Sequence, residues 1–134
     1  MSMNPIEFSK TIYLGDRFVE GFHFDCQSRV VKIQVDCISR VRGNSWNYYA
    51  DEDIQNGILI FNKVKSLMLE PNGFDPNDWI EILNVQAISD KLFQVNISMG
   101  SVSSTGSSTE IVASIECEEL FLGVPGEPEQ FIRT

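Results

Sequence analysis

The sequence predicts a mainly β protein: an antiparallel sheet of about six to eight strands, curled into a barrel or packed as a sandwich, with one or two short helical turns. Apolar and polar residues alternate with period two in several segments, which is typical of strands with one buried face. Strand-like segments also follow one another with short links, and such an order favours antiparallel pairing. The 134 residues are within the usual range for a single domain, taken as residues 1–134.

The clearest element is a hairpin over residues 18–37. Its turn is either Gln27-Ser28 or a four-residue loop on the same axis. The predicted pairs are Phe24 with Val31, Phe22 with Ile33, Glu20 with Val35, and Phe18 with Cys37. A slip of one residue would place the two apolar sets on opposite faces, so the pattern itself selects this register. We therefore expect Phe22, Phe24, Val31, Ile33 and Val35 to be buried, and His23 to lie on the opposite face.

The remaining elements follow from the same alternation. Further strands are predicted at residues 10–14, 58–69, 80–87, 92–98 and 110–121, with Ser89-Asp90-Lys91 as the turn of a second hairpin. Helical turns are predicted at residues 75–79, where Asp75 is a suitable N-cap and Pro76 follows it, and at residues 51–55. Residues 101–109 are rich in serine and predict a flexible loop, and residues 123–134 predict an extended tail.

Composition indicates the compartment and excludes several classes of function. The first residues lack a secretory signal pattern, no apolar run approaches the ~20 residues that span a bilayer, and the three cysteines show no CxxC spacing. We therefore expect a cytoplasmic protein that does not cross a membrane. The net charge of -9 repels phosphate backbones, so nucleic-acid binding is not expected. Residues 92–134 hold six glutamates and one base, Arg133.

No motif for catalysis or cofactor binding is present. His23 is the only histidine, and neither GxSxG nor a glycine-rich phosphate loop occurs. An EF-hand loop starting at Asp51 would need glycine at its sixth position and glutamate at its twelfth, where the chain has Asn56 and Asn62. We therefore expect a protein that is not an enzyme, with no catalytic residue, no metal site and no cofactor.

Two clusters are candidates for binding a partner. The first is the aromatic group Trp46, Tyr48 and Tyr49 with the acidic residues Asp51, Glu52 and Asp53, and the second is Glu116, Glu118 and Glu119. Aromatic rings offer a large contact area at a small entropic cost, and carboxylates can steer a cationic partner. The alternatives are that the aromatic residues enter the core, and that the glutamates form a solvated strand face. Alternation places Glu116 and Glu118 on one face and Cys117 and Glu119 on the other.

The sequence also resembles a family of small uncharacterised bacterial proteins over about residues 12–98. The resemblance lies in the segments IYLGDR (12–17), QVDCISR (34–40), WNYY (46–49) and DEDI (51–54) followed by Gly57. It implies no activity and no functional residues. The size and acidity are in addition similar to those of immunity proteins that neutralise bacterial toxins.

These observations support two hypotheses. The first is a non-catalytic acidic protein-interaction module that binds a basic protein, with an immunity protein against a basic toxin as its specific form. The alternative is a small-molecule-binding β-barrel, because a barrel of this length can enclose one apolar ligand. Its predicted lining is Phe18, Phe22, Phe24, Trp46 and Trp79. No feature of the sequence indicates the oligomeric state.

Overall fold

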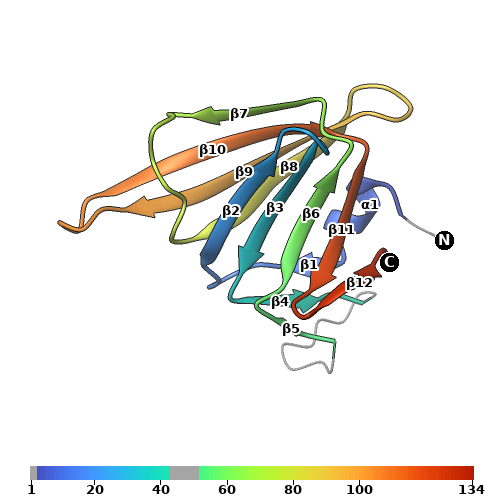
Figure 1. The fold of residues 1–134 in the computed structure, drawn as a ribbon, viewed down its shortest axis with the longest axis horizontal. Helices are drawn as coiled ribbons and strands as arrows, with labels where there is room; N and C mark the ends of the chain where they lie inside the picture. Colours follow the sequence, from blue (N-terminus) through green and yellow to red (C-terminus); the bar gives the residue numbers. More distant parts are fainter. Residues whose placement is uncertain (1–2, 43–51) are drawn as a thin grey trace.

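The computed structural model describes residues 3–42 and 52–134. These residues form one short helix and twelve strands (Figure 1). In chain order the elements are α1 (Pro5–Ser9), β1 (Ile12–Tyr13), β2 (Val19–Asp25), β3 (Val30–Val35), β4 (Cys37–Arg40), β5 (Ile54–Gln55), β6 (Ile58–Asn62), β7 (Ser66–Glu70), β8 (Ile80–Ala87), β9 (Phe93–Val102), β10 (Ser108–Cys117), β11 (Glu119–Val124) and β12 (Glu127–Ile132).

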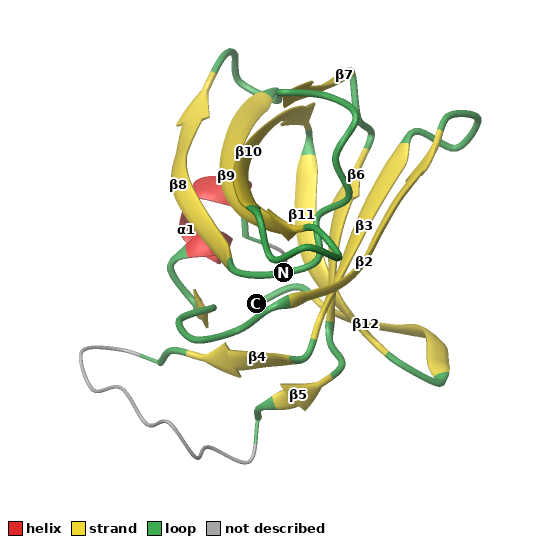
Figure 2. Ribbon diagram, turned by 90° about the vertical axis from the view of Figure 1, so that its left-hand side faces the viewer, coloured by secondary structure: helices red, strands yellow, loops and turns green. Residues whose placement is uncertain are grey.

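The strands form three antiparallel sheets, which confirms the predicted mainly β, antiparallel class, although twelve strands form where about six to eight were predicted. A five-stranded sheet has the order β12-β11-β6-β3-β2, a four-stranded sheet has the order β7-β10-β9-β8, and a small sheet has the order β1-β4-β5. None of these sheets closes on itself within the described residues, so the barrel form of the prediction is wrong. Figure 2 shows the two larger sheets as separate layers, and their inward side chains form one shared core. The arrangement is therefore sandwich-like.

The predicted hairpin is present as β2 and β3, with the expected register near its turn. Phe24 pairs with Val31, and Phe22 pairs with Ile33. The connection is the four-residue loop 26–29, in which the carboxylate of Asp25 accepts hydrogen bonds from the backbone N–H groups of the second and third loop residues. Among the residues expected to be buried, Val31, Ile33 and Val35 are fully buried, whereas Phe22 and Phe24 are partly buried against the core.

The far end of this hairpin differs from the prediction. An irregularity between Val19 and Gly21 shifts the register, so Val19, and not Glu20, lies opposite Val35. A bulge of this kind adds one unpaired residue and exchanges the two faces beyond it. Val19 therefore enters the core and Phe18 is 45% exposed. The predicted pair of Phe18 with Cys37 is also wrong, because Phe18 bridges to Trp79 and Cys37 belongs to β4.

The second predicted hairpin is confirmed, and two predicted long strands are each divided. β8 pairs with β9 around the turn at residues 88–92. The segment 58–69 forms β6 and β7, and the segment 110–121 forms β10 and β11. In both cases the chain passes from one large sheet to the other at the break. Lys63, in the first break, has a φ of 54°, which an extended strand does not allow.

Neither predicted helical turn forms in the described residues. Trp79 bridges to Phe18 and leads into β8, and Ile54–Gln55 form β5. The helix lies instead at residues 5–9, where Asn4 and Glu7 form a reciprocal capping box and a proline occupies the first turn. This signal is readable in the sequence. Helix α1 contacts β8, β9 and β11, so it covers the side of the sandwich between the two large sheets (Figure 2).

The predicted loop at residues 101–109 begins and ends in strands, and the predicted tail at residues 123–134 also contains a strand. Ser101 and Val102 close β9, Ser108 opens β10, and the exposed tip between them covers residues 103–107. The tail at residues 123–134 contains β12, which pairs with β11. Among the described residues, none forms a helix long and apolar enough to cross a membrane.

Candidate partner-binding surface

The outer face of the four-stranded sheet gathers polar side chains from four strands. Directly opposed residues of antiparallel strands share a face, so the register defines rows across the sheet. The outward rows are Glu81-Ser98-Val112-Glu70, Asn84-Asn96-Ser114-Met68, Gln86-Gln94-Glu116-Ser66, and the pair Gly100-Glu110. The residues between them, such as Ile97, Met99, Ala113 and Ile115, are buried in the core. We call the outward rows the acidic face.

Hydrogen bonds run along these rows and fix the side chains. Asn96 Nδ2 donates to Asn84 Oδ1 at 2.8 Å, and Ser114 Oγ donates to Asn96 Oδ1 at 2.6 Å. In the next row Gln86 Nε2 donates to Gln94 Oε1 at 2.7 Å. Because these side chains are already ordered, a partner that contacts them would lose less side-chain entropy on binding.

An aromatic residue, Trp79, borders the acidic face at the end where β9 and β10 form their hairpin. Trp79 Nε1 donates to Ser98 Oγ at 3.3 Å, and Ser98 Oγ donates to Glu110 Oε2 at 2.6 Å. The indole ring lies so close to Gly100 that a Cβ there would overlap it. Gly100 is therefore required for this approach, and the indole N–H orients Ser98, which in turn donates to the Glu110 carboxylate.

The charge of this sheet has one sign. Strands β7 to β10 contain four glutamates and no lysine, arginine or histidine. All four glutamates, Glu70, Glu81, Glu110 and Glu116, are outward. Glu116 accepts a hydrogen bond from Ser66 Oγ at 2.8 Å and Glu110 accepts one from Ser98 Oγ at 2.6 Å, and both of these partners are neutral hydroxyls. Carboxylates without counter-charges on one face produce a negative potential over it.

The structure separates the predicted carboxyl-terminal cluster. Glu116 lies on the acidic face, Glu118 is exposed between β10 and β11, and Glu119 lies on the outer face of the other large sheet. There Glu119 accepts a hydrogen bond from Asn62 at 2.6 Å and pairs with Arg133 at 3.7 Å. The prediction that Glu119 shares a face with Cys117 is wrong, because the break at Glu118 passes the chain to the other sheet.

The other predicted cluster is only partly described. Trp46, Tyr48, Tyr49 and Asp51 lie outside the described residues. Glu52 forms a bidentate ion pair with Arg42, with N–O distances of 2.7 and 3.1 Å. These hydrogen bonds lower the pKa of Glu52 and raise the pKa of Arg42. Figure 1 shows β5, which follows Asp53, at the opposite end of the molecule from β7 and β10. Glu52 and Asp53 are therefore not brought to the acidic face.

A buried arginine beside that ion pair connects the residue before β1 to Thr134. Arg40 is 2% exposed and donates to the backbone oxygen and the hydroxyl of Thr11, at 3.3 and 2.9 Å, and to the backbone oxygen of Thr134 at 3.0 Å. Burial lowers the pKa of Arg40 to about 10, so its guanidinium stays charged at neutral pH. These contacts give Arg40 a structural role.

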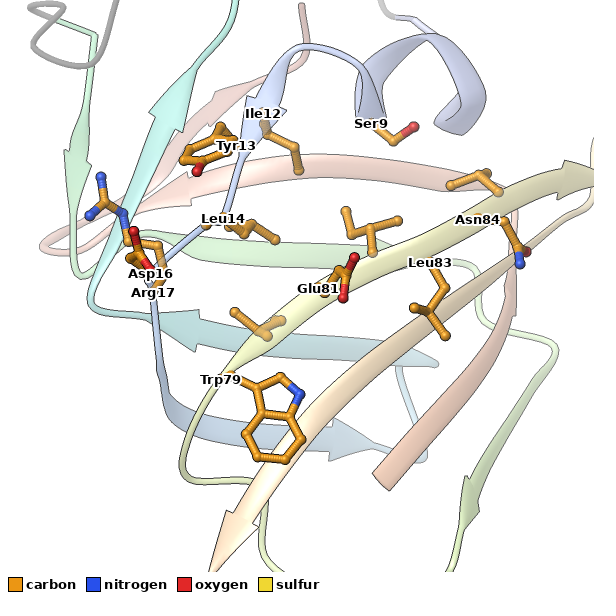
Figure 3. Close-up of a pocket in the computed structure, with 14 residues that line it drawn as sticks. Ser9, Ile12, Tyr13, Leu14, Asp16, Arg17, Trp79, Glu81, Leu83 and Asn84 are labelled. Atoms are coloured by element: carbon orange, nitrogen blue, oxygen red, sulfur yellow. The ribbon is translucent and has the colours of Figure 1, made fainter. Parts of the chain in front are cut away.

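A groove of about 610 Å³ adjoins one edge of the acidic face (Figure 3). One wall is the run Trp79–Val85, which enters and follows β8, and the other is the segment from Ile12 to Arg17, with Ser9 at one end. Asp16 and Glu81 are exposed carboxylates on opposite walls. The Nη2 atom of Arg17 donates to the buried Ser39 Oγ at 2.8 Å, whereas its buried Nε has no hydrogen-bond partner.

The groups considered for catalysis are dispersed. His23 is exposed on β2 and lies opposite Lys32. Cys26 is exposed in a turn, whereas Cys37 and Cys117 are buried. Burial raises the pKa of both buried thiols, that of Cys117 to about 12. Within the described ranges, no group of three or more histidine, cysteine, aspartate or glutamate residues could hold a metal ion.

A family model covers nearly the whole sequence. Residues 3–134 match the model described as "Family of unknown function (DUF6258)". The chain belongs to this family. No curated protein and no solved structure matches it. The family has no assigned function, so a function for this chain has to be inferred from the surfaces of its own structure.

Sequence reasoning missed three of the four glutamates of the acidic face, namely Glu70, Glu81 and Glu110. A signal was available, because residues 66–117 contain seven acids and only one base, Lys91. Single strands did not reveal that these acids share a face. The cross-strand register brings them together from segments that are far apart in the sequence.

Proposed function

We propose that this DUF6258 protein is a non-catalytic interaction module that binds a basic protein through the acidic face. The observation that carries the proposal is the set of four outward glutamates on a sheet whose strands contain no cationic residue. Complementary charge accelerates encounter with a cationic partner and disfavours anionic ones. The net charge of -9 adds to this long-range attraction.

The specific form of this proposal is an immunity protein that neutralises a basic toxin. Its support is the acidity of the chain and of the sheet, together with the lack of a recognisable catalytic set in the sequence. Such a module would act by covering the cationic surface of its partner, which requires no chemical step.

The test compares two variants of equal charge. The first, E70Q/E81Q/E110Q/E116Q, neutralises the acidic face, and each glutamine keeps an oxygen that can accept the hydrogen bonds of Ser66 and Ser98. The matched control, D90N/E118Q/E127Q/E129Q, neutralises four exposed acids outside that sheet. Binding of a fluorescent lysine decapeptide is measured by anisotropy at low and at raised ionic strength.

We expect the face variant to weaken peptide binding by at least ~10-fold and the control variant by less than ~3-fold, because contact charges matter more than distant screened ones. Raised salt should weaken binding to the wild-type protein. An equal loss of peptide affinity in both variants would show that binding depends on the net charge alone and would refute the assignment to this face.

The alternative function, binding of a small molecule, is supported by the groove beside β8. Its volume of about 610 Å³ is in the range of small-ligand sites, and Trp79 lines it together with apolar residues of β8. It is not the enclosed barrel cavity expected from the sequence. Native mass spectrometry of the freshly purified protein tests this alternative, because a bound ligand would add a defined mass to the chain.

A further inference from the structure

Strand β8 is an edge strand, and the groove follows its free edge. It ends the order β7-β10-β9-β8, so within the described part of the chain only its β9 side is paired. Consecutive residues from Trp79 to Val85 line the groove, and they alternate between the inner and outer faces of the sheet. A groove lined by both faces of a strand runs along its edge. Edge strands present unpaired N–H and C=O groups at alternate residues.

The described residues of the opposite wall form no backbone pairing with this edge. The backbone N–H of Arg17 donates to Leu14 at 3.3 Å, and no backbone hydrogen bond joins residues 14–17 to β8. Among residues 3–42 and 52–134, strand β1 is itself an edge of the small sheet and pairs only with β4. The groove therefore separates two strand edges, and its run of about six residues on β8 corresponds to roughly 20 Å of extended chain.

The side chains at the groove define the kind of segment that fits. Glu81 and Asp16 place exposed carboxylates on the two walls, and Leu83 adds an apolar side chain that is 46% exposed. A strand that enters the groove would alternate its side chains between the two faces of the sheet. Basic residues on its outward face would continue the rows of the acidic face, next to Glu81.

The pairing of β8 with β9 is irregular between Ile82 and Asn84, and this irregularity makes the edge selective for the strands that can pair with it. Bulges at edges disfavour indiscriminate pairing with other exposed strands. Leu83 lies in this irregular stretch. A segment that offers backbone hydrogen bonds alone therefore cannot pair regularly along the whole of β8. Occupancy then depends on side-chain contacts in the groove as well as on backbone pairing.

We propose that the groove accepts an extended segment of the basic partner, with alternating basic and apolar residues, that pairs with β8 as a fifth strand of the four-stranded sheet. The proposal rests on the proposed function, because it takes the cationic character of the occupant from the acidic face. Backbone hydrogen bonds supply affinity in this mode, and alternate side chains supply specificity.

The probe is an acetylated decapeptide of alternating lysine and valine. Two matched peptides carry backbone N-methyl groups, one on every lysine and the other on every valine, so that charge and side chains are unchanged. At least one methylated peptide should bind at least tenfold more weakly, because its methyl groups replace the N–H groups that face β8. Amide hydrogen exchange at residues 80–87 should slow when the unmodified peptide is bound.

Two substitutions locate the site. Leu83→Lys places a cation in the groove, and Ile88→Lys places one just beyond β8 at a residue that is 49% exposed, close to the 46% of Leu83. We expect the first to weaken binding at least tenfold and the second by less than threefold. Circular dichroism checks that both variants are folded.

The outcomes separate the two proposals. If both methylated peptides bind as tightly as the unmodified one and β8 exchange is unchanged, strand addition is refuted, while binding to the acidic face can still stand. If an alternating threonine–valine decapeptide protects β8 as well as the lysine–valine peptide does, strand addition stands and the basic character of the partner is refuted. Failure of every peptide to bind would refute both.

Discussion

At the scale of single residues, neighbours on β3 have opposite surroundings. Ile33 is fully buried between the two large sheets, and the adjacent Lys32 is exposed on the outer face. Ile33→Ala should lower the free energy of unfolding by about 2–5 kcal/mol, because it removes buried methyl groups and leaves a cavity. Lys32→Ala should change it by less than about 0.5 kcal/mol. Urea unfolding of both variants tests this, and equal losses would mean that the faces are reversed.

The three cysteines also differ in burial. Cys26 is exposed, whereas burial raises the pKa values of Cys37 and Cys117 and disfavours the reactive thiolate. A thiol reagent at pH 8 should therefore label Cys26 in the folded protein and all three cysteines after unfolding. Mass spectrometry of digested, labelled protein identifies the sites. Rapid labelling of Cys117 in the folded state would contradict its place in the core.

At the scale of elements, the tip of the β9–β10 hairpin at residues 103–107 is exposed and holds itself by local bonds. Ser103 N–H donates to Ser107 O at 2.8 Å, and Gly106 has a φ of 88°, which favours glycine. Replacing the tip with a two-residue Asn-Gly turn should leave the fold intact and change stability by well under ~2 kcal/mol. Thermal unfolding tests this. If the shortened protein fails to fold, the tip must pack on the body of the domain.

Alternation in the sequence was sufficient to predict which residues of β2 and β3 pair near their turn, and to predict that the segments of β8 and β9 form a hairpin. It did not predict the bulge at Glu20 or the breaks at Lys63 and Glu118. Each of these changes a face or transfers the chain between sheets, and the residues around it still alternate locally. Helix α1 was predictable from the pairing of Asn4 with Glu7, because a capping box is a local signal.

At the scale of the whole molecule, the cationic residues are distributed unevenly between the two layers. The four-stranded sheet has no cationic residue in its strands, whereas the five-stranded sheet contains His23 and Lys32, and Arg133 follows its last strand. Of the acidic face, only Glu116 was among the residues selected from the sequence. The rest depends on tertiary pairing, since Glu81 and Glu70 become the two ends of one row only through Ser98 and Val112.

Nuclear magnetic resonance can locate the binding of a basic partner on the acidic face residue by residue. The lysine decapeptide is titrated into the isotope-labelled protein, and the shifted backbone and side-chain amide signals are mapped. We expect the largest shifts on residues of the outward rows, including the side-chain amides of Asn84, Gln94 and Asn96, and we expect them to diminish at ~0.5 M salt. Shifts centred on β11 and β12, with none on β8 to β10, would contradict this expectation.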